Sequence, residues 1–290
     1  MYFSNYNLLG RNRNKERKEN YNYSSLRRKI LKFYTKRFKG RDFTLYPIGD
    51  WHAGSRQFCE PFAKKIISEI KDNPKAWWCG MGDMMENAII GSKSDIYTQN
   101  IPPKEQLEHI VDMLSPIKHK GLFLIYGNHE TRTMRMVGLQ PEQYIGLQLG
   151  LPVMGFSCMA EFLLPECHTP YGFSCYFHHT AGGSYATSGK IGKIESMRKI
   201  APTVDAVFTA HHHMTARLPQ TWYECGRGQA LKKTGYDYGT GSALTWDGSY
   251  AEEKGSRPAT VEHIKVTFVG SNDGRATDGR RQIYEVISGQ

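Results

Sequence analysis

The stretch GMGDMMENA, residues 80–88, follows the apolar run Ala76-Trp77-Trp78-Cys79. An apolar run of this length that ends in glycine is typical of a buried strand. In open α/β sheets, ligands bind outside the carboxyl ends of the strands. The stretch therefore predicts an α/β fold in which a strand end delivers the side chain of Asp83 into a ligand-binding crevice.

Four further apolar runs end in aspartate, asparagine or histidine. They are residues 43–48 before Asp50 and His52, residues 122–126 before Asn128, His129 and Glu130, residues 173–177 before His178 and His179, and residues 204–209 before His211, His212 and His213. One such residue alone is ordinarily a helix cap, a turn residue or a hydrogen-bonded core histidine. Five strand ends with the same chemistry instead predict one site, built from five loops around Asp83. Carboxylate, amide and imidazole ligands without cysteine suit manganese, iron or zinc, and their number is sufficient for two metal ions.

The motifs at these strand ends resemble the five signature blocks of the calcineurin-like metallophosphoesterase superfamily. The blocks are GDWH at 49–52, GDMMEN at 82–87, GNHE at 127–130, FHHT at 177–180 and AHHH at 210–213. The resemblance covers residues 43–215, and the start Asp50-x-His52-x-Gly54 is most similar to bacterial and phage Mre11-like phosphoesterases. It implies a two-sheet β-sandwich flanked by helices, in αββα layers, within the α/β class.

The same resemblance implies a role for each motif residue in a dinuclear phosphoesterase that works by attack of a metal-bridging hydroxide. It assigns one metal to Asp50, His52 and His213, the other to Asn128, His211 and one of His178 and His179, and a bridging position to Asp83. We favour His179, which sits at the strand end, and we favour Mn²⁺ over Fe or Zn. The general acid would be His129, with Glu86 as its orienting carboxylate and Glu130 as the alternative.

Four positions depart from the family pattern. The fourth block commonly reads His-Gly, whereas here Thr180 follows His178 and His179. Ala210 stands where the last block usually has glycine, and His212 lies between the two expected ligands, so we expect its side chain to point away from the site. Asn87 replaces the arginine that follows the second block in protein phosphatases. That replacement speaks against phosphoprotein phosphatase activity.

Positive charge is concentrated at the start of the chain. Residues 1–41 contain 13 of the 38 Lys and Arg residues but only two of the 28 acidic residues, a net charge of +11 in a chain of net charge +10. We therefore divide the chain into a basic arm, residues 1–41, and a metallophosphoesterase domain, residues 42–290. From Ser24, apolar residues Leu26, Ile30, Phe33 or Tyr34, and Phe38 recur at helical spacing, which predicts a basic amphipathic helix. It could contact nucleic-acid phosphates, lie on a membrane surface, or dock on the core with a solvated basic face.

The remaining core reads as alternating strands and helices, then as strands alone. Helices are predicted over residues 60–71, from residue 103, and over residues 190–200, and further strands near 162–164, 238–246, 261–269 and 281–288. Repeated β-α-β units favour a largely parallel sheet.

The function favoured by these observations is phosphodiester hydrolysis in nucleic acid, which the basic arm would bind. The alternatives are a small-molecule or nucleotide phosphomonoesterase and a non-catalytic, metal-containing binding protein. The first residues lack the apolar segment of a secretion signal, no run is long enough to span a membrane, and the six cysteines show no CxxC spacing. We therefore expect a cytoplasmic protein with reduced thiols, and the sequence leaves homo-oligomers open.

Overall fold

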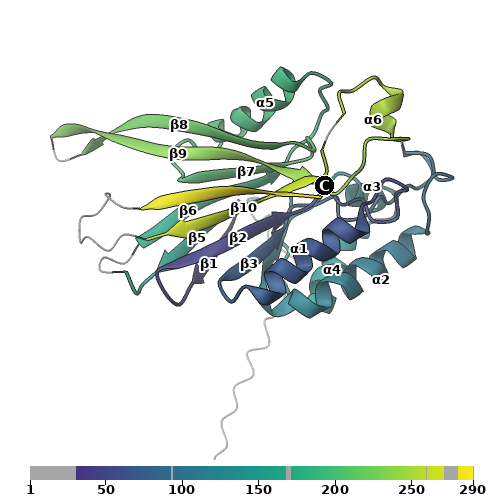
Figure 1. Cartoon of the computed structure of the whole chain (residues 1–290), viewed down its shortest axis with the longest axis horizontal. Coiled ribbons are helices and arrows are strands. Elements are labelled where there is room, and N and C mark those ends of the chain that lie inside the picture. The colour runs from purple at the N-terminus through teal and green to yellow at the C-terminus, as the bar shows by residue number, and fades with distance from the viewer. Residues whose placement is uncertain are drawn as a thin grey trace, which may run out of the picture. The chain divides into compact units, whose positions relative to one another are not determined.

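Eleven strands of the described residues join into one curled sheet. The computed structural model describes residues 31–92, 94–167, 171–226, 228–258, 260–270 and 280–289. The strands are β1 (Lys32–Arg37), β2 (Asp42–Ile48), β3 (Ala76–Gly80), β4 (Gly121–Leu124), β5 (Ser157–Leu164), β6 (Tyr171–His179), β7 (Ala206–Ala210), β8 (Thr215–Gly226), β9 (Gln229–Ser242), β10 (Glu262–Val269) and β11 (Arg281–Ser288). They pair in the order β1-β5-β6-β7-β9-β10-β2-β3-β4, with β8 on β9 and β11 on β10 (Figure 1).

The sheet has two halves, and among the described residues only a short pairing of β9 with β10, at Ser242 and Gly241, joins them. The β2, β3 and β4 strands run parallel, and so do β6, β7 and β9. Antiparallel partners complete each half, so the sheet is mixed rather than largely parallel.

An aromatic core fills the space between the two halves. Phe43 of β2 stacks on Phe268 of β10 with ring centroids 4.9 Å apart, and Phe177 of β6 stacks on Phe208 of β7 at the same distance. Phe162 of β5 packs edge-on against Phe43. Residues from both halves thus share one buried cluster, which makes the arrangement a sandwich.

Helices cover both outer faces of this sandwich. The helices are α1 (Glu60–Asp72), α2 (Pro103–Leu114), α3 (Glu130–Val137), α4 (Pro141–Leu149), α5 (Thr187–Ser196) and α6 (Tyr250–Glu253), with 3-10 helices at Ser115–Lys120 and Met197–Lys199. Residues of α1, α2 and α4 pack on the outer face of β2 and β3 (Figure 1). Val207 of β7 and Tyr176 of β6 face the opposite outer side, against Ala201 and Val204. The layers are therefore those expected, αββα.

The predicted helix at residues 24–38 is wrong where the structure describes it. Residues 32–37 form strand β1, which pairs in parallel with β5 from Lys32 opposite Cys158 onward. A period of two explains the strand, because alternate side chains turn inward: Tyr34 packs edge-on against Phe123, and the Lys36 ammonium lies 4.3 Å above the Trp77 ring. The part of the predicted helix before residue 31 lies outside the described residues.

Most other predicted elements match the structure to within a few residues. Helix α1 ends at Asp72, α2 begins at Pro103, and α5 begins three residues before the predicted Lys190. The long hairpin of β8 and β9 was not predicted, and the strand expected at 238–246 is the end of β9, which stops at Ser242. No helix among the described residues has the length and apolar character needed to cross a membrane.

Candidate metal centre

The predicted site residues gather where five strands of the sandwich end. Asp50 and His52 follow β2, Asp83 follows β3, and Asn128 follows β4 by four residues. His179 is the last residue of β6, and His211 and His213 follow β7. Three groups of potential ligands result, each with ligand atoms within 4.8 Å of one another: Asp50, His52 and His213; His52, Asp83 and His129; Asp83, His179 and His211.

Backbone strain is concentrated in the same residues. Among non-glycine residues in the described part of the chain, positive φ angles occur at Asp50, His52, Asp83, Asn87, His211 and His213. Such angles are costly for residues with a Cβ and persist only where the surrounding structure enforces them. Five of these six residues are predicted metal ligands, so the strained positions mark the site independently of the motifs.

Hydrogen bonds between adjacent loops enforce this backbone. The Asp50 and Trp51 amides donate to the carbonyls of Gly82 and Asp83 at 3.0 and 2.9 Å. Trp51 is fixed in turn, because its indole Nε1 donates to buried His263 Nε2 at 3.1 Å. The loop after β2 is therefore held on the loop after β3, and a buried histidine of β10 supports it.

A close approach of the loops after β3 and β4 requires glycine. A Cβ on Gly127 would lie 2.1 Å from the Asp83 amide nitrogen and 2.2 Å from Asp83 Oδ1. Both distances are far inside van der Waals contact. Only glycine at position 127 lets the GNHE segment approach Asp83 this closely.

The two aspartates use their carboxylates in the same way. One oxygen of each is occupied by a backbone amide: Asp50 Oδ2 accepts from His211 N at 2.7 Å, and Asp83 Oδ1 accepts from His129 N at 2.8 Å. The other oxygens, Asp50 Oδ1 and Asp83 Oδ2, are buried and accept no well-aligned hydrogen bond within the described residues. Each faces imidazoles instead, with Asp50 Oδ1 at 3.5 Å from His213 Nε2 and Asp83 Oδ2 at 3.2 Å from His179 Nε2.

Burying a carboxylate oxygen without a partner costs several kcal/mol unless a cation neutralises it. A divalent metal would satisfy both orphaned oxygens and would be ligated by the imidazole nitrogens around them. The chemistry of these side chains therefore fits metal ions, and one cation near each aspartate is consistent with the three ligand groups.

The neighbouring histidines His178 and His179 separate as adjacent strand residues must. His179 Nδ1 lies 2.7 Å from the Met81 carbonyl, and its Nε2 lies 3.0 Å from Asn128 Oδ1. A ring nitrogen fixed by a carbonyl leaves the other nitrogen aimed at a metal. His179 belongs to one of the three ligand groups, and His178 lies outside them.

His212 also lies where it was expected, away from the site. Its Nε2 is 2.8 Å from the Thr180 hydroxyl, and it joins none of the three ligand groups. His211 and His213, on either side of it, both belong to such groups.

His129 and Glu86 lie together beside His52, with a difference from the predicted contact. His129 Nδ1 is 2.7 Å from the Glu86 carbonyl oxygen and 3.6 Å from the carboxylate. The carboxylate lies nearer to His52 Nδ1, at 3.2 Å. Glu86 therefore orients His129 mainly through its backbone, because the His52 ring takes the carboxylate.

Glu130, the alternative partner of His129, binds backbone amides instead. Its buried carboxyl accepts from the amides of Asp83 and Met85, each at 3.1 Å. Arg132, which the sequence did not single out, donates from Nη1 to the Glu86 carbonyl and to Ser94 Oγ, each at 3.2 Å. The strand-end pattern could not show Arg132, because it lies inside a helix.

Charges in the site reinforce one another. Burial alone would lower the pKa of His179, but the carboxylates of Asp83 and Asp50 outweigh it and raise the pKa to about 10. Burial opposes ionisation of Glu86, yet the hydrogen bond and charge of His52 lower its pKa to about 2. Burial lowers the pKa of His129 to about 3, despite the nearby Asp83 carboxylate. The carboxylates of the site are thus ionised, and a bound cation would stabilise them.

Comparisons with known proteins add little to this geometry. No protein-family model and no curated protein matches the sequence. A solved structure of a conserved uncharacterised protein from Streptococcus pneumoniae, a predicted phosphoesterase, is similar at 9% identity, with 84% of this chain and 98% of that chain covered and a TM-score of 0.34. Vps29 from Chaetomium thermophilum is similar at 11% identity, with 84% and 95% covered and a TM-score of 0.31. The complex of that Vps29 with a cyclic peptide is similar at 12% identity, with 85% of this chain and 96% of that chain covered and a TM-score of 0.33.

Proposed function

We propose that this chain is a phosphoesterase that depends on two divalent metal ions. The observation that carries the proposal is the pair of buried carboxylate oxygens, Asp50 Oδ1 and Asp83 Oδ2, each surrounded by imidazole nitrogens and without a well-aligned hydrogen bond in the described residues. One metal would be held by Asp50, His52 and His213, the other by Asn128, His179 and His211, with Asp83 shared between them. Mn²⁺ is our first choice, and Fe and Zn accept the same ligands.

Bound metal ions would supply Lewis-acid stabilisation of the phosphate oxygens and a water of lowered pKa. The chain itself would position the phosphate and move protons. Within the site, His129 Nδ1 faces the Glu86 carbonyl, so its other nitrogen, Nε2, faces Asp83 Oδ2 at 3.9 Å. A proton at Nε2 is thus placed to reach the oxygen of a leaving alcohol.

A general acid must carry a proton, and burial lowers the pKa of the His129 imidazole to about 3. The negative charge of a bound phosphate beside the ring would favour the protonated form.

We propose phosphodiesters of nucleic acid as the substrate class. The support is the charge of residues 1–41, a net +11, which suits phosphate backbones. Residues 32–37 of this segment belong to strand β1, so nucleic-acid binding through it would not require the predicted helix there.

The test compares bis(4-nitrophenyl) phosphate with 4-nitrophenyl phosphate, using the full chain with added Mn²⁺. Asp83→Asn keeps the size of the side chain and removes the charge that both metal positions use. We expect preferential hydrolysis of the diester, at least about a thousandfold loss in Asp83→Asn, and lower bound metal in that variant by elemental analysis. Preference for the monoester would identify a nucleotide or small-molecule phosphatase. An Asp83→Asn protein with full activity would refute the metal centre itself.

A further inference from the structure

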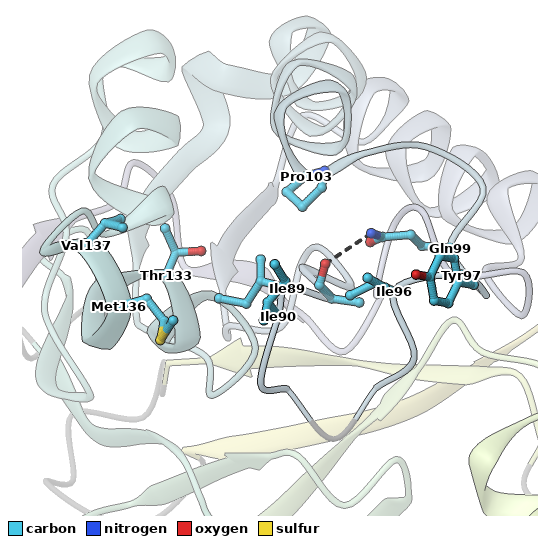
Figure 2. A pocket seen from close by; sticks show the side chains of 10 residues that line it. Ile89, Ile90, Ile96, Tyr97, Gln99, Pro103, Thr133, Met136 and Val137 are labelled. Carbon is cyan, nitrogen blue, oxygen red and sulfur yellow. Dashed lines mark hydrogen bonds between the residues drawn. The ribbon is translucent and has the colours of Figure 1, made fainter.

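We propose that an apolar cavity, lined in part by the α3 residues that follow His129, binds a flat aromatic ring of the leaving group, such as a nucleobase. This inference rests on the proposed phosphoesterase function. The cavity has a volume of about 540 Å³, within the range of small-molecule sites, and opens to solvent. Figure 2 shows the side chains that line it. Its lining is mainly apolar and includes Ala88, Ile89, Ile96, Tyr97, Met136 and Val137.

One wall of the cavity continues the helix that begins at His129. His129 is the N-cap of α3 and itself has helical backbone angles. Thr133, Met136 and Val137 follow it by four, seven and eight residues, the spacing of one helical face. At about 1.5 Å per residue, Met136 lies about 10 Å along the helix from His129. The proposed acid and the cavity therefore share one face of α3.

The other wall continues the loop that carries Glu86. Ala88 and Ile89 come two and three residues after Glu86, and Gln99 donates to the Ala88 carbonyl at 3.0 Å (Figure 2). Asn87 binds the two walls together, because its Nδ2 donates to the His129 carbonyl at 2.6 Å and to Thr133 Oγ1 at 3.0 Å. Both walls are thus linked to Glu86 and His129, through the chain itself and through Asn87.

The chemistry of the lining selects an apolar ligand. The two polar side chains deep in the wall are already used, Thr133 by Asn87 and Gln99 by the Ala88 carbonyl. At the rim, Ile90, Tyr97 and Met136 are 79%, 82% and 63% exposed, although large apolar side chains favour burial. A flat ring can stack on Tyr97 and contact the sulfur of Met136 without needing a hydrogen bond.

The position beside the acid identifies which part of the substrate enters. In ester hydrolysis the general acid protonates the leaving oxygen, so the leaving alcohol lies next to His129. A ring attached to that alcohol would extend along α3 into the cavity. The P–O bond to this alcohol breaks, water supplies the new P–O bond, and the alcohol leaves with the proton from His129.

The experiment compares two diesters whose leaving alcohols have similar acidity, methyl 2-naphthylmethyl phosphate and methyl ethyl phosphate, with the full chain and Mn²⁺. We expect kcat/KM for naphthylmethanol release to exceed that for ethanol release roughly tenfold or more, mainly through KM. Binding of 2-naphthylmethanol to the metal-free protein, followed by saturation-transfer NMR, gives a readout independent of turnover. Met136→Asp and Tyr97→Ala should reduce both the ratio and the NMR signal. The matched control is Leu139→Asp, since Leu139 is 69% exposed but does not line the cavity.

The outcomes separate the two proposals. Equal hydrolysis of both diesters, without naphthylmethanol binding, would overturn the ring site and leave the phosphoesterase intact. No hydrolysis of these diesters or of bis(4-nitrophenyl) phosphate would overturn the function and, with it, the leaving-group assignment. Self-association that Met136→Asp abolishes, with an unchanged ester ratio, would show that a second copy covers the cavity and would refute the ring site.

Dithymidine phosphate and analogues that lack one of its two bases identify the source of the ring. A loss of rate when the base on the leaving side is removed would indicate a nucleobase. Equal rates with and without either base, together with preference for the naphthylmethyl ester, would indicate a non-nucleotide aryl ester.

Discussion

Adjacent histidines in two pairs give the sharpest residue-level test of the metal centre. His179 and His211 lie in ligand groups with Asp83, whereas His178 and His212 lie outside them. We expect His179→Asn and His211→Asn to lose bound Mn²⁺ and at least about a hundredfold in activity, since removing only the outer support of a metal ligand costs 10–100-fold. His178→Asn and His212→Asn are the matched controls and should keep both. The measurement is metal stoichiometry after dialysis, and metal retained equally by all four variants would contradict the ligand assignment.

His129 allows metal binding and proton transfer to be separated. We expect His129→Asn to retain its metals and to lose about 10²–10⁴ in rate on esters of poorly acidic alcohols. The loss should shrink with 4-nitrophenol as leaving group, because that group departs without a proton. Rate constants for a series of leaving alcohols test this, and a loss independent of leaving-group acidity would rule out the acid role.

The sequence could predict which residues meet at the site, but not how they are held. Strand ends carrying Asp, Asn and His are visible as a pattern. The structure brings six of the seven predicted ligands into the three groups, and Asn128 contacts one of them, His179. The positive φ of Asp83 is enforced by neighbouring loops. The hydrogen bond of Trp51 with His263 joins a loop to strand β10, more than 200 residues further along the chain. No local pattern encodes such a pairing, so His263 was missed.

At the level of elements, α4 supports the site through a buried carboxyl group. Glu142 accepts from the Gly127 amide at 2.7 Å and from the Gln140 amide. Burial raises the pKa of Glu142 to about 7, from 4.5 in a solvated chain. The folded state therefore binds the Glu142 proton more tightly than the unfolded state does. The contribution of this proton to the free energy of unfolding is complete below pH 4.5 and is lost as the pH rises through about 7.

Glu142→Gln should remove this pH dependence. The amide keeps an acceptor for Gly127 and offers a donor to Gln140 Oε1, which is buried without a partner. The variant should match the wild type near pH 4 and exceed its free energy of unfolding by up to about 3 kcal/mol at pH 8. Urea unfolding at both pH values measures it, with exposed Glu105→Gln as control. A variant less stable than the wild type at pH 8 would contradict the assignment.

A buried ion pair fixes the 3-10 helix after α5 to β9. Arg198 Nε donates to Asp237 Oδ1 at 2.6 Å, and its other nitrogens donate to the carbonyls of Val204 and Tyr236. Arg198→Met should cost about 3–5 kcal/mol of unfolding free energy, because Asp237 stays buried without its cation. Exposed Lys199→Met should cost little, and adding Asp237→Leu to Arg198→Met should recover stability. Failure of the double variant to recover any stability would show that the carbonyl contacts dominate.

Strand β1 shows where element prediction from sequence reaches its limit. Leu26, Ile30, Phe33 or Tyr34, and Phe38 fit a helical period, but Tyr34, Lys36 and Phe38 also fit a period of two. Pairing with the edge of β5 decides between helix and strand, because residues 32–37 form a ladder with it. An edge more than a hundred residues away is invisible in the segment itself.

At the scale of the whole molecule, the layers followed from the sequence while the connections between them did not. The resemblance of the strand-end motifs to a known superfamily implied an αββα sandwich, and the described residues form one. The single curled sheet depends on β9 bending from one half into the other at Gly241, whose φ is +88°. A lone glycine in a strand is too common a signal to predict that bend.

The pairing of β2 with β10 has a consequence for how the protein is made. Thr44 lies opposite Thr267, so the strand that precedes Asp50 gains this neighbour only after residue 267 has left the ribosome. Contacts of such sequence separation give a high contact order and slow folding. In shorter nascent chains the loop that carries Asp50 thus lacks this support, and the proposed metal centre would form only after residue 267 has been made.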